Sequence, residues 1–146
     1  MNEKSAPGRG DFRHFMAIPT RWMDNDVYGH VNNVTYYSYF DTAVNHHLIE
    51  AGGLDMNNDD AFGVVAETGC RFFSELAFPD IIDAGLRVVR LGNSSVTYEI
   101  GLFRHGSDAV AALGRFVHVW VDRETRRPVQ IPDKIRRALE PLVVEP

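Results

Sequence analysis

The chain has little of several features that define whole classes of protein. Its 146 residues include a single cysteine, Cys70, so no disulfide can form within the chain. No apolar run reaches the length of about 20 residues that a membrane-spanning helix needs. The polar opening of the chain also lacks the apolar core of a signal peptide. We therefore expect a soluble, cytoplasmic protein.

Basic residues are not in excess either. The formal net charge is −5, and arginine and lysine gather only near the C-terminus, over positions 123–137. A nucleic-acid-binding domain usually has a basic excess, so the charge argues against that class. The adjacent His46 and His47 would point about 100° apart on a helix, and no second cysteine is present to complete a zinc site. We expect no metal or other cofactor.

The composition is otherwise typical of one globular domain. Apolar residues make up 45% of the chain and charged residues 24%, and a chain of this length can bury a substantial core. The first eleven residues are polar and carry Pro7, Gly8 and Gly10, which indicates a flexible tail. We therefore expect a tail over residues 1–11 and a single domain over residues 12–146.

One segment has the periodicity of an amphipathic helix. The apolar positions that recur at spacings of three and four are Tyr37, Phe40, Val44, Leu48 and Ala51. Either Asn32 or Asn33 can cap the start of this helix through its side-chain oxygen. The pair Gly52 and Gly53 would end it.

The remaining segments alternate as β-strands do. The strands we expect cover residues 12–22, 63–73, 81–91, 96–103 and 109–121. Pro19 lacks a backbone donor, so it indicates a sheet edge or a bulge. The long apolar run 109–121 indicates a central strand, and Asp133 could cap a short last helix. This order predicts an α+β fold, in which an antiparallel sheet of about five strands surrounds one long central helix.

A cluster of polar and ionisable residues lies directly before the expected helix. Residues 24–33 read Asp-Asn-Asp-Val-Tyr-Gly-His-Val-Asn-Asn. The first turn of a helix has unpaired backbone N–H donors, which can stabilise an oxygen that becomes negative during acyl transfer. A carboxylate beside such donors supplies a base or a nucleophile. The segment therefore predicts an acyl-transfer site.

The pattern D-x-D-x-x-G-H-V-N-N-x-x-Y-x-x-Y-F, from Asp24 to Phe40, resembles the signature of hotdog-fold acyl-CoA thioesterases of the 4-hydroxybenzoyl-CoA thioesterase type. Weaker similarity continues at residues 70–73, 91–95 and 127–132. The resemblance implies hydrolysis of acyl-CoA without a cofactor. It also implies a substrate site shared by two subunits, in a homodimer or a dimer of dimers. The apolar surplus of residues 109–121 likewise indicates an interface.

Matched residue by residue, the resemblance implies that Asp26 is the catalytic carboxylate and that the Asn33 N–H polarises the thioester carbonyl. His30 occupies the place of a histidine that belongs to the active site in plant acyl carrier protein thioesterases. Those enzymes carry an asparagine where this chain has Tyr28. The motif therefore lacks the residue that would orient His30.

Further candidates for substrate binding are Tyr36, Glu67, Arg90, Ser94 and Ser95. Tyr36 belongs to an aromatic group that usually forms core, although one member can line an acyl pocket. Glu67 lies where some hotdog enzymes place a second acid. The two serines match a family position near bound CoA, and Arg90 can either pair with a CoA phosphate or contact solvent at a sheet edge.

Other functions stay open. A thioesterase that acts on acyl carrier protein would use the same chemistry, but it would need a basic docking patch for an acidic carrier. A non-catalytic hotdog module that binds acyl-CoA would not need Asp26, so the presence of this carboxylate argues against that alternative. Hydratases of this fold have an aspartate and a histidine separated by four residues, which Asp26 and His30 match only loosely.

Overall fold

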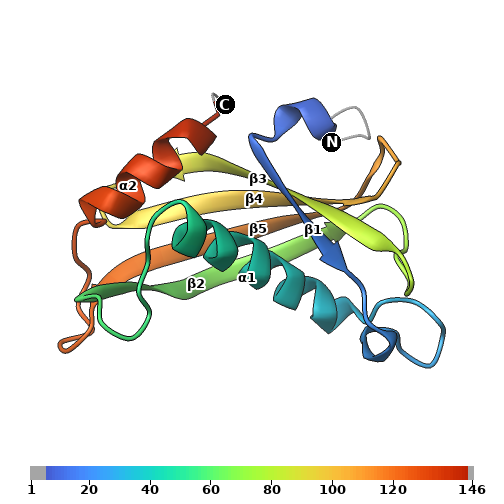
Figure 1. Cartoon of the computed structure of the whole chain (residues 1–146), viewed down its shortest axis with the longest axis horizontal. Helices are drawn as coiled ribbons and strands as arrows, with labels where there is room; N and C mark the ends of the chain where they lie inside the picture. Colours follow the sequence, from blue (N-terminus) through green and yellow to red (C-terminus); the bar gives the residue numbers. More distant parts are fainter. Residues whose placement is uncertain (1–5, 145–146) are drawn as a thin grey trace.

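The computed structural model describes residues 6–144, which form one antiparallel sheet of five strands and one long helix (Figure 1). The strands are β1 (His14–Pro19), β2 (Ala61–Phe72), β3 (Ile81–Leu91), β4 (Ser95–Arg104) and β5 (Val110–Asp122). Their order in the sheet is β1-β3-β4-β5-β2, so β1 and β2 are the edges. The expected α+β architecture is confirmed, with Pro19 at the end of an edge strand and β5 inside the sheet.

The long helix α1 (Asn33–Glu50) lies across one face of the sheet (Figure 1). Its cap is Asn32, whose side-chain oxygen accepts a hydrogen bond from the Val34 N–H (3.0 Å). The helix residues buried against the sheet are Tyr36, Tyr39, Phe40, Ala43, Val44, His47 and Leu48. Ala51 is exposed, in contrast to the prediction, because the helix ends one residue before it.

The contact between α1 and the sheet is close at one glycine. A β-carbon on Gly114 of β5 would lie 2.5 Å from the Phe40 ring, so only glycine admits this ring. Phe40 is fully buried as a result. A filled core of this kind follows from the interdigitation of side chains in protein interiors.

A second, short helix follows the sheet. Helix α2 (Asp133–Leu139) packs through Ile135 and Leu139, which are buried. The prediction that Asp133 caps this helix is wrong. Asp133 is its first residue, and the preceding Pro132 has no side-chain oxygen with which to cap it.

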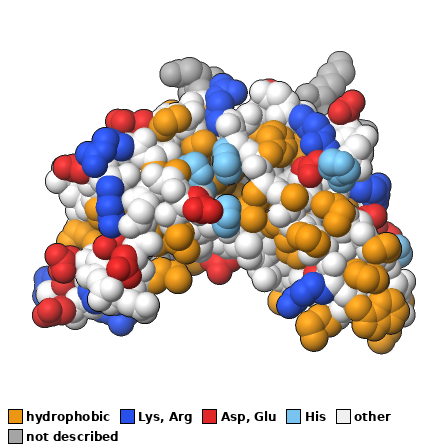
Figure 2. Space-filling model, in the orientation of Figure 1, with side chains coloured by type: hydrophobic (Ala, Val, Ile, Leu, Met, Phe, Trp, Pro, Cys, Tyr) orange, Lys and Arg blue, Asp and Glu red, His pale blue; other side chains and the backbone are white. Residues whose placement is uncertain are grey.

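The end of the molecule at which α1 begins carries large apolar side chains on its surface. The segment between β1 and α1 contains the 3₁₀ helix η3 (Trp22–Asp24). Trp22, Met23, Val27 and Tyr28 are all exposed there. Figure 2 shows hydrophobic side chains gathered at this end of the molecule. Exposed apolar groups in such number mark a functional surface more commonly than an inert one.

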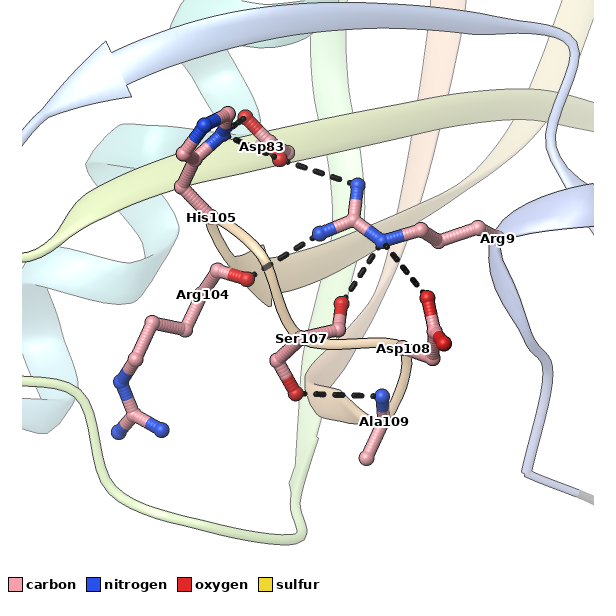
Figure 3. Close-up of polar contacts among 7 residues, drawn as sticks. All are labelled: Arg9, Asp83, Arg104, His105, Ser107, Asp108 and Ala109. Atoms are coloured by element: carbon pink, nitrogen blue, oxygen red, sulfur yellow. Dashed lines mark hydrogen bonds and ion pairs between the residues drawn. The ribbon is translucent and has the colours of Figure 1, made fainter.

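The segment expected to be a flexible tail makes contacts with the domain over the part that the structure describes. Residues Arg9–Asp11 form the 3₁₀ helix η2. The Arg9 guanidinium donates to the Asp83 carboxylate (3.0 Å) and to the Ser107 carbonyl (2.7 Å), as Figure 3 shows. Arg9 thus ties this part of the expected tail to the domain, and the rest of that tail, residues 1–5, lies outside the described residues.

The face of the sheet opposite α1 has its own small apolar cluster. Its buried members are Phe12, Phe103, Val110 and Leu113, with Ala6 packed against them. Val110 and Leu113 belong to the apolar run in which we expected an interface. The chain itself therefore covers part of that apolar surplus.

Candidate active site

The segment of residues 20–32, here named the Asp26 loop, is closed by backbone hydrogen bonds. The Asp26 N–H donates to the His30 carbonyl (2.9 Å), and the Gly29 N–H donates to the Asp26 carbonyl (3.1 Å). Gly29 has a φ of 86°, a conformation that glycine adopts without steric cost. The Asp26 carboxylate accepts from the Tyr28 N–H (2.9 Å). Asp26 and His30 thus stand at the two ends of one tight turn.

Asp24 attaches this loop to α1. Its buried carboxylate accepts hydrogen bonds from the Tyr39 hydroxyl (2.7 Å) and the Arg21 N–H (2.9 Å), and it pairs with the Arg21 guanidinium (2.9 Å). Burial acts to raise the pKa of Asp24, but these donors outweigh burial and hold the pKa below its usual range. The Asp24 carbonyl also accepts from the Asn32 N–H (2.9 Å). Asp24 therefore ties the Asp26 loop to α1.

A cavity of about 660 Å³ opens beside the start of α1. Its wall contains four of the predicted site residues, namely Asp26, His30, Asn33 and Tyr36. The end of β2 and the loop after it form the opposite wall with Phe72, Phe73, Ser74 and Glu75. The remaining lining residues are Tyr28, Val31 and Asn32. The structure thus brings together the candidates that the motif predicts.

The start of α1 can supply a backbone donor to this cavity. The Asn32 cap binds the N–H groups of Val34 and Thr35, so these capping bonds do not use the N–H of Asn33. Tyr36, one turn further along, is buried, and its ring packs edge-on against Phe72 with centroids 4.9 Å apart. Burial raises the pKa of Tyr36, so its hydroxyl is neutral at physiological pH.

His30 has a partner that the motif does not contain. Its Nε2 lies 2.5 Å from Oε2 of Glu75. The backbones on either side are tied together, because the Val31 N–H donates to the Leu76 carbonyl (2.8 Å). Leu76 is fully buried, so Glu75 projects from an anchored segment. The group that contacts the His30 ring is therefore a carboxylate from a distant segment and not a residue of the motif.

Glu75 was missed because nothing local in the sequence points to it. It lies 45 positions after His30, and their contact depends on how the end of β2 meets the Asp26 loop. The available signal was an acid placed two residues after the weak family match at residues 70–73. An acid at the end of a strand usually contacts solvent, so that signal is faint.

The other predicted binding residues lie away from this cavity within one chain. Glu67 is exposed on β2, where it pairs with Arg115 (3.4 Å). Arg90, Ser94 and Ser95 stand at the turn between β3 and β4. Ser95 pairs with Val119 of β5, and Val119 pairs with Val64 of β2, which precedes Phe72 by eight residues. Ser95 therefore lies about 26 Å from Phe72 along the strand direction.

Cys70 is partly buried on β2 and is a poor nucleophile. Burial raises the pKa of its thiol to about 12, so its thiolate is scarce near neutral pH. Within residues 6–144, no group of three histidine, cysteine, aspartate or glutamate side chains is placed to hold a metal ion. The described helices include none that is both long and apolar enough to cross a bilayer.

A long helix on an antiparallel sheet, with a carboxylate-bearing loop at the helix start, defines the hotdog thioesterase class. The chain belongs to the thioesterase-like superfamily, whose family model matches residues 20–139. The hotdog fold predicted from the motif is therefore confirmed.

Solved structures share this fold over nearly the whole chain. The PA5185 protein of Pseudomonas aeruginosa strain PAO1 is 55% identical, with a TM-score of 0.93 and coverage of 94% of this chain and 96% of that one. A predicted thioesterase from Bacillus stearothermophilus is 26% identical (TM-score 0.77; coverage 90% and 97%). A thioesterase from Thermus thermophilus, solved in complex with coenzyme A and Zn, is 29% identical (TM-score 0.75; coverage 90% and 95%).

Proposed function

We propose that the protein hydrolyses acyl-CoA thioesters to the free acid and CoA. The observation that carries this proposal is the cavity in which Asp26, the first residue of α1 and the His30–Glu75 pair meet. Membership of the thioesterase-like superfamily supports thioester hydrolysis in general. The coenzyme A complex of the Thermus thermophilus relative supports CoA as the carrier of the acyl group.

Asp26 begins the reaction in one of two ways. As a general base it takes a proton from water, and the water oxygen attacks the thioester carbon. As a nucleophile its own oxygen attacks that carbon and forms a mixed anhydride, which water then hydrolyses. In both cases the thioester oxygen becomes negative. The Asn33 N–H and the positive end of the α1 dipole stabilise that charge.

Departure of CoA completes the reaction. The carbon–sulfur bond breaks, its electron pair moves to sulfur, and the resulting thiolate takes up a proton. In this proposal His30 gives that proton through Nδ1, since its Nε2 is in contact with the Glu75 carboxylate. Glu75 acts as a positioning residue in this proposal, since its carboxylate contacts Nε2 and holds the imidazole ring in one orientation.

A second subunit completes the site in this proposal. Strand β2 is a sheet edge, and its residues Val65 and Phe72 are exposed. An unpaired edge tends to pair with its twofold mate, which for β2 is the antiparallel β2 of a second copy. Such pairing brings the far end of the partner's sheet, with its copies of Arg90 and Ser94, toward this cavity. The CoA contacts implied by the family resemblance then fall on both subunits.

Release of free thiol from a panel of acyl-CoAs tests the function. The panel covers short, medium, long and aromatic acyl groups. Asp26→Asn is expected to lower kcat by about two orders of magnitude or more, because the base or nucleophile is lost. Asp41→Asn, an exposed carboxylate on α1, is the matched control. The proposal would be overturned if no acyl-CoA in the panel released thiol. Thiol release only from acyl groups carried on acyl carrier protein would favour the alternative of an acyl carrier protein thioesterase.

A further inference from the structure

Beyond the chemistry at Asp26, the surface around the Asp26 loop indicates which acyl groups the site takes. We propose that the acyl chain runs outward from Asp26 along an apolar groove formed by Trp22, Met23 and Val27. The substrates would then be medium- and long-chain acyl thioesters. This inference rests on the proposed thioester hydrolysis, because that reaction places the acyl carbon at Asp26.

The groove shares Asp26 with the cavity of the candidate site. It has a volume of about 610 Å³. Its lining residues are Trp22, Met23, Asn25, Asp26, Val27 and Gly29. Asp26 thus stands in the wall of both hollows. A thioester whose carbon lies at Asp26 can therefore send one arm into each.

The two hollows differ in chemistry. The cavity at α1 combines polar groups, among them His30, Asn33 and Glu75, with a wall of aromatic side chains, and its polar groups suit the amides of the CoA arm. In the groove, the exposed fraction of the surface is 77% for Trp22, 73% for Met23 and 93% for Val27. Hydrophobic side chains gather at this end of the molecule in Figure 2. An aliphatic chain laid along them removes apolar surface from water on both sides.

The core offers no competing path for the chain. The Tyr36 ring packs against the buried Tyr39 ring, with centroids 6.2 Å apart, and Phe40 and Leu76 are fully buried. The Phe40 ring already fills the space above Gly114. An acyl chain directed past Tyr36 would have to displace these groups from a close-packed interior, which is costly. The outward direction needs no such rearrangement.

A chain-length comparison tests the groove. The measured quantity is kcat/KM for dodecanoyl-CoA divided by kcat/KM for butanoyl-CoA, which share the CoA arm. Each methylene buried is worth up to about fourfold. Met23→Ser is expected to lower the ratio by about fivefold to twentyfold. Met56→Ser, in the exposed loop between α1 and β2, changes the same residue type outside the groove and is expected to keep the ratio.

Tryptophan fluorescence gives a second readout that does not depend on turnover. The chain has two tryptophans, and Trp120 is fully buried, so a change of environment reports on Trp22. Titration of the Asp26→Asn protein with dodecanoyl-CoA is expected to shift the emission to shorter wavelength. Butanoyl-CoA, added at the same concentrations, is the control for effects of the CoA arm.

The outcomes separate the groove from the function. Thiol release with an unaltered ratio in Met23→Ser and no emission shift would overturn the groove and leave the hydrolysis standing. A uniform loss for both substrates, with a changed mass in light scattering, would assign the surface to a contact between copies and also overturn it. Without thiol release from either acyl-CoA in the unaltered protein, the proposed function itself fails.

Discussion

Replacing Tyr39 by phenylalanine tests the bond that attaches the Asp26 loop to α1. The Tyr39 hydroxyl donates to the buried Asp24 carboxylate over 2.7 Å. A hydrogen bond to a charged group contributes about 1.5 to 3 kcal/mol. Arg21 still supplies its N–H and its guanidinium to the same carboxylate, so the charge keeps partners in the variant. We therefore expect the free energy of unfolding to fall by about 2 kcal/mol.

Urea unfolding at a fixed protein concentration measures this loss, and a thermal scan should show a melting temperature lower by about 6 °C. The control is Tyr37→Phe, on the same helix, whose hydroxyl forms no hydrogen bond within residues 6–144. A loss smaller than about 0.5 kcal/mol in Tyr39→Phe would refute the reasoning, because it would fall below the value of an ordinary neutral hydrogen bond.

The difference in the free energy of unfolding between the unaltered protein and Tyr39→Phe should depend on pH. The pKa of folded Asp24 lies below its usual value of about 3.9. The folded state therefore binds fewer protons there than the unfolded state, and the stability that Asp24 confers is present above the unfolded pKa. As the pH falls through the folded pKa, that stability is lost. The difference between the unaltered protein and Tyr39→Phe should therefore shrink in acid.

Four further expectations follow from the site, the core and the sheet edge. His30→Ala should lower kcat by about tenfold to a hundredfold in the thiol-release assay, less than Asp26→Asn. Glu75→Gln should lower kcat with little change in KM, and Glu75→Asp should restore part of it; equal loss in all Glu75 variants would exclude a positioning role. Burial lowers the pKa of His118 to about 4, so the unfolded state binds more protons between about pH 4 and 6.5, and stability should fall by up to about 3 kcal/mol as the pH drops through that window. His118→Leu should flatten that urea-unfolding profile, and an unchanged slope would contradict the assignment. Light scattering should show a dimer at micromolar concentration, and a stable, fully active monomer would remove the shared-site mechanism.

Local pattern was enough to predict most of the fold. The alternation of residues 81–91 matches β3, and the three-and-four spacing from Tyr37 to Leu48 lies within α1. Helix periodicity and strand alternation are set by residues close in sequence, so the sequence alone shows them. The family motif placed Asp26, His30 and Asn33 around one cavity for the same reason, since they lie within eight positions.

Contacts between distant segments could not be predicted in this way. Glu75 meets His30 only because the end of β2 stops beside the Asp26 loop, which depends on sheet register. Arg9 pairs with Asp83 across a still longer separation of 74 positions in the chain. Residues 1–11 are polar and contain glycines, a composition typical of a flexible tail. Composition does not reveal that Arg9 of this segment pairs with Asp83 of the sheet.

Phe12 has a practical consequence for anyone who shortens or extends the chain. Its ring occupies the space above Gly85 and Gly101, where added β-carbons would lie 2.9 Å and 2.5 Å from its atoms. Deleting residues 6–12 would uncover Phe103, Val110 and Leu113 and leave a bare apolar surface prone to aggregation. A purification tag or fusion partner is therefore best joined upstream of Ala6. Alanine at either glycine would dislodge the same ring without any change in chain length.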